Sequence, residues 1–118
     1  MKIRKIAELL NADVLSGEEF LDREVHSAFG CDMMSDVLAF VNEQAVLITG
    51  LCNPQVVRTA EMMDMNCIVF IRGKVPPKEV IVLAKEAGIV LLASKERMYR
   101  ACGLLYTHGL SGGSVANE

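Results

Sequence analysis

The sequence predicts an α/β domain of three layers (α/β/α), in which helices cover both faces of a mainly parallel sheet of about five strands. Runs of consecutive apolar or β-branched residues at 45–49, 67–71 and 89–92 lack the polar alternation of a half-exposed strand, so each is expected to be buried on both faces. Segments with helical spacing of apolar positions lie between these runs. Strands that alternate with helices in this way form right-handed crossovers and parallel sheets.

The N-terminal part of the chain predicts one helix and two further strands. Apolar residues recur at helical spacing over 2–10, which predicts a short amphipathic helix. A short strand is expected at 14–15, followed by a charged surface connection over 18–23. The next strand is expected at 25–29, since apolar and β-compatible residues follow one another there.

Polar residues mark the starts of the first two helices that follow strands. Asp32 is expected to cap a helix over 33–41, because its carboxylate can accept a hydrogen bond from an unpaired N–H of the first turn. Residues 42–44 then form the turn into the central strand. Asn53 is expected to cap the helix at 54–65 in the same way, with a proline at its first position.

Similar signals divide the C-terminal half of the chain. Asn66 suits the turn that ends the preceding helix, and Pro77 suits the first turn of a helix that Gly88 ends. Ser94 is expected to cap the last helix. The apolar residues expected on the core faces of these helices are Val56, Val57, Ala60, Met63, Val80, Leu83, Ala84, Ala87, Met98, Ala101, Cys102 and Leu105.

Length and composition predict a single domain at 1–108, followed by a Gly/Ser-rich tail at 109–118. No run approaches the ~18 apolar residues that a membrane helix needs, and no signal-peptide block opens the chain, so we expect a cytoplasmic protein without a membrane partner. The formal net charge is -3, and no basic run is interleaved with aromatic residues. These properties argue against nucleic acid as a partner.

The loops after the predicted strands gather the residues suited to ligand binding. In an open parallel sheet the carboxyl ends of the strands meet at one edge, and ligands bind there near a point where the strand order reverses. Helix N-termini and the cations Arg72 and Lys74 favour a phosphate or carboxylate at this edge. The residues expected to bind a small anionic, phosphate- or nucleotide-like ligand are Asp32, Gly50, Asn53, Arg72, Gly73, Lys74 and Ser94. The alternative is that they are turn and cap residues only.

Four cysteines stand at wide, unequal spacings without a C-x-x-C pair, so reduced thiols are expected instead of a zinc site or a disulfide framework. Cys67 and Cys102 are expected in the core. Cys31 and Cys52 both follow strand ends, which leaves open a redox pair or half of a metal site. The alternative function is therefore a small enzyme, or a thiol- or metal-dependent protein, that uses the loops around Cys31, Asp32 and Cys52.

No motif in the chain dictates a reaction. Gly73-Lys74 is not a P-loop, because no glycine stands five residues before Gly73 and Val75 replaces the Ser or Thr that would contact magnesium. Neither His26 nor His108 has a partner that spacing identifies. The sequence therefore predicts no catalytic residue, no metal and no cofactor, and it favours a non-catalytic binding or regulatory module.

The order and spacing of several segments resemble the DRTGG domain, a small α/β module. The segments at 11–15, 21–25, 45–50, 73–76 and 87–92 carry the resemblance, which extends over about 9–105. It implies a regulatory or ligand-sensing role, as in modules found with CBS domains or attached to acetyl-transfer and pyrophosphatase enzymes. It also implies a fold similar to the N-terminal domain of bacterial HPr kinase/phosphorylase.

The chain departs from this family at the polar residues of two loops. Gly50-Leu51-Cys52 stands where family members typically show Gly-Asp-Arg, and Ile71-Arg72-Gly73 stands where they show Thr-Gly-Gly. Gly50 and Gly73 keep the turns, but a function of the replaced polar residues does not carry over.

Apolar residues on the outer faces of two helices predict a homodimer. Met62 and Met65 are rotated away from the core face of the helix at 54–65, and Val82 is left out on the next helix. Methionine suits adaptable contact surfaces, and symmetric dimers are the commonest soluble assembly. We expect self-association through Met62 and Met65, and we keep a regulatory protein as an alternative partner.

Overall fold

The computed structural model describes residues 1–41 and 44–113, and it has the predicted α/β fold. Its sheet has five strands in the order β1-β5-β4-β3-β2. Neighbouring strands from β2 to β5 are parallel, and β1 pairs with β5 in the antiparallel direction. The strands are β1 (Asp13–Ser16), β2 (Ser27–Gly30), β3 (Ala45–Thr49), β4 (Cys67–Phe70) and β5 (Val90–Ala93).

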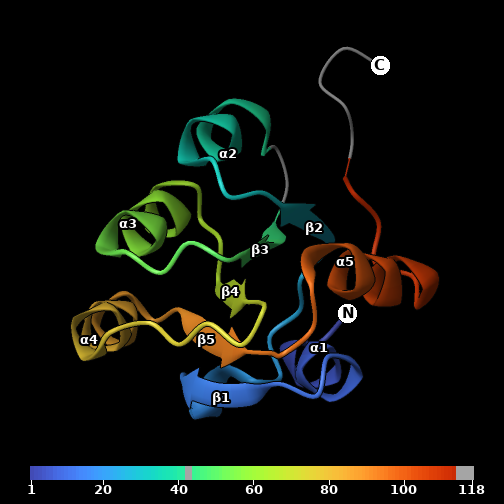
Figure 1. The fold of residues 1–118 in the computed structure, drawn as a ribbon, viewed down its shortest axis with the longest axis horizontal. Helices are drawn as coiled ribbons and strands as arrows, with labels where there is room; N and C mark the ends of the chain where they lie inside the picture. The colour runs from blue at the N-terminus through green and yellow to red at the C-terminus, as the bar shows by residue number, and fades with distance from the viewer. Residues whose placement is uncertain (42–43, 114–118) are drawn as a thin grey trace.

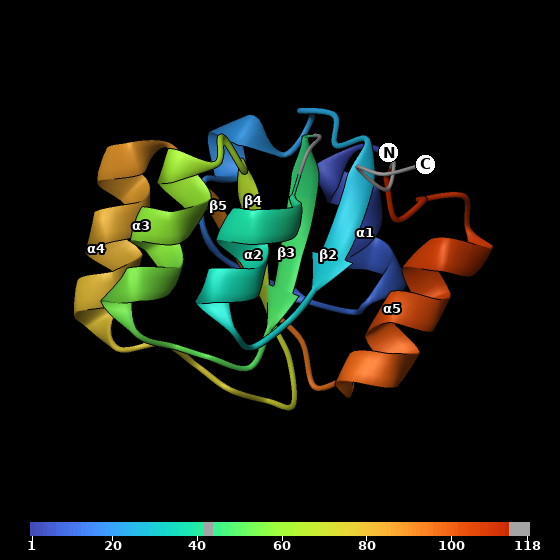
Figure 2. The ribbon, with the colours of Figure 1, turned by 90° about the horizontal axis from the view of Figure 1, so that it is seen from above.

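Helices cover both faces of the sheet, as predicted (Figure 1). Three of them, α2, α3 and α4, lie on one face, and α1 and α5 lie on the other (Figure 2). Because β2 to β5 follow one another across the sheet in a single direction, three right-handed crossovers place their helices on the same face. The helices are α1 (Ile3–Leu9), α2 (Met34–Phe40), α3 (Pro54–Met62), α4 (Lys78–Ala87) and α5 (Met98–Thr107), with a short 3-10 helix, η1 (Glu18–Phe20).

The central strand shows why continuous apolar runs predicted a sheet covered on both faces. Successive residues of a strand point to opposite faces, so Val46 packs in the cluster beneath α1 and α5. Its neighbour Leu47 packs in the cluster beneath α2, α3 and α4 with Val57. Every residue of β3 is buried.

Two predicted helix signals are confirmed. The side chain of Asn53 accepts a hydrogen bond from the N–H of Val56 at 3.3 Å, and Pro54 begins α3. Gly88 ends α4 at a φ of 70°, a left-handed conformation that glycine adopts without the Cβ penalty. Both signals act through groups within a few residues of each other in the sequence.

Other predicted helix ends are wrong. α2 and α5 begin after Met33 and Arg97, so neither Asp32 nor Ser94 is a cap. At the end of α3 the left-handed residue is Asp64, with a φ of 56°, instead of Asn66. The N–H of the next residue, Met65, then donates to the carbonyl of Ala60 at 2.8 Å, which turns Met65 back toward the core.

The segment after α5 packs against the domain for as far as it is described. Leu110 is buried in the cluster under α5, and the carbonyl of Ser111 accepts a hydrogen bond from the N–H of Ala28 in β2 at 2.9 Å. Leu110 and Ser111, within the segment predicted as a Gly/Ser-rich tail, therefore contact the domain. The rest of that tail, 114–118, and the turn residues 42–43 lie outside the described part of the chain. Within 1–41 and 44–113, no helix is long and apolar enough to cross a membrane.

Candidate functional site

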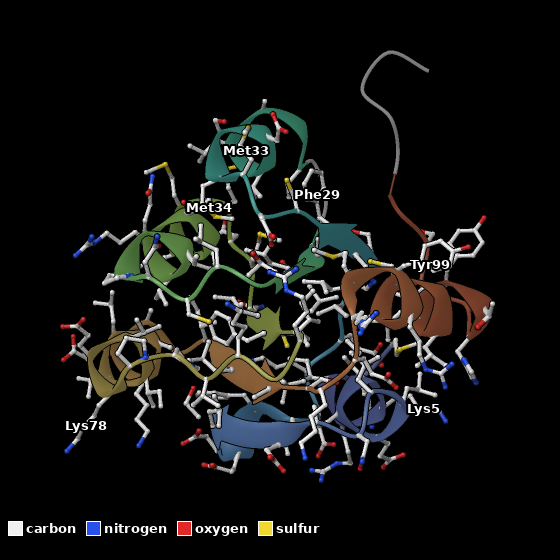
Figure 3. All side chains as sticks on the ribbon, viewed as in Figure 1. Lys5, Phe29, Met33, Met34, Lys78 and Tyr99 are labelled. Carbon is white, nitrogen blue, oxygen red and sulfur yellow. The ribbon has the colours of Figure 1, made fainter. Side chains whose placement is uncertain are left out.

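The carboxyl ends of three parallel strands bring Asp32, Gly50 and Arg72 together. Asp32 follows β2, Gly50 follows β3 and Arg72 follows β4, and these strands are neighbours in the sheet. Met33, labelled in Figure 3, stands directly after Asp32 at the start of α2. We call Asp32, Thr49, Gly50 and Arg72 the carboxyl-edge cluster.

Asp32 is held in place by hydrogen bonds to β3 and its loop. Its Oδ1 accepts from the N–H of Gly50 at 2.8 Å and from the hydroxyl of Thr49 at 3.0 Å. Its Oδ2 lies 3.4 Å from Nη2 of Arg72. These contacts, the Gly50 hydrogen bond above all, lower the pKa of Asp32 despite partial burial. Asp32 is therefore a fixed, ionised carboxylate at neutral pH.

The backbone of Arg72 directs its side chain over the end of β3. Arg72 has a φ of 61°, and its N–H donates to the carbonyl of Glu96 at 2.8 Å. The guanidinium then lies against Gly50, where a methyl group in place of hydrogen would clash with it. Gly50 is thus required for this close approach, and not for an unusual φ. The sequence did not predict that Gly50 makes room for the Arg72 guanidinium, because Arg72 follows a different strand.

The switch point of the sheet lies between β4 and β5, because the helices that follow these two neighbouring strands lie on opposite faces of the sheet. α4 follows β4 on one face of the sheet, whereas α5 follows β5 on the other. Such a point commonly opens a ligand crevice. Here the two loops bridge it, since Arg72 bonds to Glu96 and the N–H of Gly73 donates to the carbonyl of Ser94 at 3.0 Å. The ion pair between Arg72 and Asp32 instead lies at the ends of β4 and β2, with Gly50 of β3's loop between them.

The remaining predicted ligand residues have different environments. The Asn53 side chain is used as the α3 cap. Lys74 is exposed, and its charge acts on Cys52. Ser94 is only 2% exposed, and its hydroxyl donates to the carbonyl of Leu10 at 2.7 Å and accepts from the N–H of Glu96 at 3.1 Å. Ser94 therefore does not present its side chain at the edge. Thr49, which sequence reasoning missed, does contact Asp32.

Cys52, in the loop after β3, does not have the character of an activated thiol. Burial raises the pKa of Cys52 in spite of the nearby charges of Lys74 and Arg72, which disfavours the thiolate that a nucleophile or metal ligand needs. Cys31 accepts a hydrogen bond from the N–H of Met33 at 3.3 Å. Cys67 is buried in the core as predicted, and Cys102 is partly buried against it.

Comparison with known proteins gives a family match and a structural match. The DRTGG domain model matches residues 5–107. A structure of the CBS and DRTGG domains of the regulatory region of Clostridium perfringens pyrophosphatase, complexed with the activator diadenosine tetraphosphate, superposes with a TM-score of 0.70 at 20% identity. The match covers 88% of this chain and 45% of that chain. Comparison with curated proteins found no match.

Proposed function

Because the chain belongs to the DRTGG domain family, we propose that it is a non-catalytic regulatory domain that binds a small anionic ligand at the carboxyl-edge cluster. The single observation that carries this proposal is the long, exposed ion pair between Arg72 and Asp32. The Arg72 side chain is 40% exposed and reaches Asp32 at 3.4 Å, a long contact, while two other hydrogen bonds already fix Asp32.

This arrangement suits an anion that competes with Asp32 for Arg72. An exposed ion pair contributes about 0–1 kcal/mol, so exchanging one carboxylate for a phosphate or carboxylate of a ligand has a low cost. Lys74, two residues along the same loop, adds a second exposed cation. Arginine binds phosphate in a bidentate geometry, so a phosphate- or nucleotide-like ligand fits best.

The structural relative supports the same ligand class. That regulatory region was solved with diadenosine tetraphosphate, which is a nucleotide polyanion. For this chain, a nucleotide-like ligand remains part of the proposal. A cytoplasmic location is proposed as well, supported by its four free cysteines.

We expect nucleotides, acyl phosphates or inorganic phosphate to raise the melting temperature in a thermal-shift screen. A ligand at about 100 times its dissociation constant stabilises by about 2.7 kcal/mol, or about 10 °C for a domain of this size. Arg72→Ala and Lys74→Ala are expected to remove most of that shift and to leave the unliganded melting temperature nearly unchanged.

Lys5→Ala is the matched control, since Lys5 is an exposed cation on α1, on the opposite face from α2, α3 and α4 (Figure 3). It removes one positive charge and should keep the full ligand shift. If the ligand still raises the melting temperature of Arg72→Ala, the anion binds elsewhere. If no compound in the screen raises the melting temperature of the native chain, the proposed function is wrong.

We further propose that the protein forms a homodimer. Its contact surface includes Met62 but not Met65, which was also predicted to take part. Met65 is 1% exposed, so it contributes nothing to an outer surface. Met62 on α3 is 72% exposed, and Val82 is exposed on the neighbouring helix α4. Exposed apolar residues on two adjacent helices support a contact surface there.

Sedimentation equilibrium tests this surface. We expect a dimer at tens of micromolar for the native chain and a monomer for Met62→Glu combined with Val82→Glu. Arg58→Glu, an exposed change on α3 that keeps both apolar residues, serves as the control. A monomeric native chain overturns the assembly, and a dimer that survives the double substitution overturns its surface.

A further inference from the structure

The Arg72 guanidinium lies between Gly50 and Asp32 at the carboxyl edge of the sheet. A Cβ placed on Gly50 would meet this guanidinium first, since the three atoms nearest to it all belong to Arg72. Gly50 is buried directly after β3, and its N–H donates to Oδ1 of Asp32. On the other side, Oδ2 of Asp32 faces Nη2 of Arg72. We call these contacts of the guanidinium with Gly50 and Asp32 the resting contact of Arg72.

The resting contact holds the guanidinium weakly. Nη2 lies 3.4 Å from Oδ2 of Asp32, whereas charge-assisted hydrogen bonds between nitrogen and oxygen are normally about 2.7–2.9 Å long. The side chain of Arg72 is 40% exposed and that of Asp32 is 48% exposed, so water screens their attraction. Exposed side chains change rotamer within nanoseconds. The Arg72 side chain is therefore free to leave Asp32 while its backbone N–H stays bonded to Glu96.

Asp32 is held more firmly than Arg72. Its Oδ1 accepts hydrogen bonds from Gly50 and Thr49, which fix the carboxylate to β3 and its loop. The Gly50 bond above all lowers the pKa of Asp32, so the carboxylate keeps its charge at neutral pH. A phosphate bound to Arg72 in the resting contact would lie beside this fixed negative charge. Like charges at such short range repel each other, which favours binding after Arg72 has moved away.

We propose that the resting contact is autoinhibitory: an anion must draw Arg72 away from Gly50 and Asp32, so these two residues weaken binding without touching the ligand. Once released, the guanidinium presents two nitrogens to a phosphate, and exposed Lys74 adds its charge from the same loop. This inference rests on the proposed function, because it concerns the regulation of the same site. The opposite role for Asp32, orienting Arg72 toward the ligand, predicts weaker binding when the resting contact is removed.

Two substitutions remove the resting contact from different sides. Gly50→Ala places a methyl group where the guanidinium lies, and it keeps the N–H that bonds to Asp32. The backbone of Gly50 is not left-handed, so alanine is compatible with it. Asp32→Asn removes the attracting charge, and its amide oxygen still accepts from Gly50 and Thr49.

Isothermal titration calorimetry with inorganic phosphate and with ADP measures the effect. We expect Gly50→Ala to bind about threefold more tightly than the native chain, since it removes an exposed ion pair and leaves the Asp32 charge in place. Asp32→Asn is expected to bind at least about tenfold more tightly, because it also removes the charge that repels the anion. Circular dichroism confirms that both variants fold.

Each substitution has a matched control. Asp22 forms another exposed ion pair, with Arg4 at 3.0 Å, before the start of β2. Asp22→Asn removes the same charge as Asp32→Asn and should leave anion binding unchanged. Gly103 is a glycine of α5 at which a Cβ meets nothing within 4 Å. Gly103→Ala should likewise bind phosphate as the native chain does.

The resting contact can also be tested without a ligand. The pKa of Asp32 is lowered first by the Gly50 hydrogen bond and further by the Thr49 hydroxyl and the Arg72 guanidinium. Gly50→Ala keeps the hydrogen bond and displaces the guanidinium. NMR titration of the Asp32 carboxyl carbon should therefore give a higher pKa in Gly50→Ala than in the native chain. An unchanged pKa overturns the resting contact, whether or not an anion binds.

The calorimetry separates this inference from the proposed function. If the native chain binds phosphate or ADP, and Gly50→Ala and Asp32→Asn bind it equally or more weakly, the autoinhibitory role is wrong and the anion site remains. If neither the native chain nor either variant binds these anions, the proposed function is wrong and the autoinhibitory role is wrong with it.

Discussion

Replacing Met65 with glutamate is expected to destabilise the domain by at least about 4 kcal/mol, enough to unfold many domains of this size. Met65 is 1% exposed and lies in the cluster under α3 and α4. The change loses about 1.5–3 kcal/mol of apolar burial. It also buries a carboxyl group, and a pKa raised by about three units adds about 4 kcal/mol at neutral pH.

The same substitution at Met62, three residues earlier, is the control. Met62 is largely exposed at the end of α3, so at concentrations below those at which the proposed dimer forms, Met62→Glu is expected to change the free energy of unfolding by less than about 0.5 kcal/mol. Urea denaturation followed by circular dichroism measures both variants. Equal stabilities would show that Met65 is not turned into the core.

The pH dependence of Met65→Glu identifies the cause of its instability. A carboxyl group whose pKa is raised in the folded state destabilises most above that raised pKa, where burial opposes ionisation. As pH falls from the raised pKa toward the ordinary value of about 4.3, stability recovers by about 1.4 kcal/mol per pH unit relative to the native chain. Met65→Gln lacks this recovery, since its amide does not titrate.

Replacing Ser94 with alanine is expected to lower the free energy of unfolding by about 2 kcal/mol. The hydroxyl of Ser94 bonds to the carbonyl of Leu10 and receives the N–H of Glu96, so its removal leaves a buried acceptor without this partner. The contact joins the end of α1 to the end of β5, which are far apart in the sequence. Thermal and urea unfolding both report the loss.

Ser35→Ala is the matched control for Ser94→Ala, because Ser35 is exposed on α2. It should change stability by less than about 0.5 kcal/mol. A ligand screen on the Ser94→Ala variant separates the structural role from a binding role. The ligand-induced shift should persist from the lower starting temperature, whereas loss of the shift with unchanged stability would contradict the structural assignment.

Much of the fold could be predicted because its signals are local. A continuous apolar run such as 45–49 predicts burial on both faces, and the structure buries each of those residues. Asn53 and Gly88 mark helix ends through bonds or backbone angles within a few residues. The family resemblance is likewise confirmed by the match over 5–107.

The candidate site was predictable only in outline. The sequence placed Asp32, Gly50 and Arg72 at one edge, because parallel strands end together. It assigned Asp32 to a helix cap, which is wrong, since its carboxylate bonds instead to Gly50, 18 positions away. A short polar side chain at a strand end can cap the helix that follows or bond to the loop of a neighbouring strand. Only the position of that neighbouring strand decides between the two.

By itself, the sequence determined the three-layer fold, the main helix signals and the edge at which the charges gather, because these follow from residue type and short-range spacing. The tertiary structure alone decided where individual side chains point. Met65 turns inward after the left-handed Asp64 into a cluster that includes Val80 and Leu91, and Ser94 is withdrawn from the edge by Leu10, 84 positions away. Such choices depend on long-range partners, which no local pattern contains.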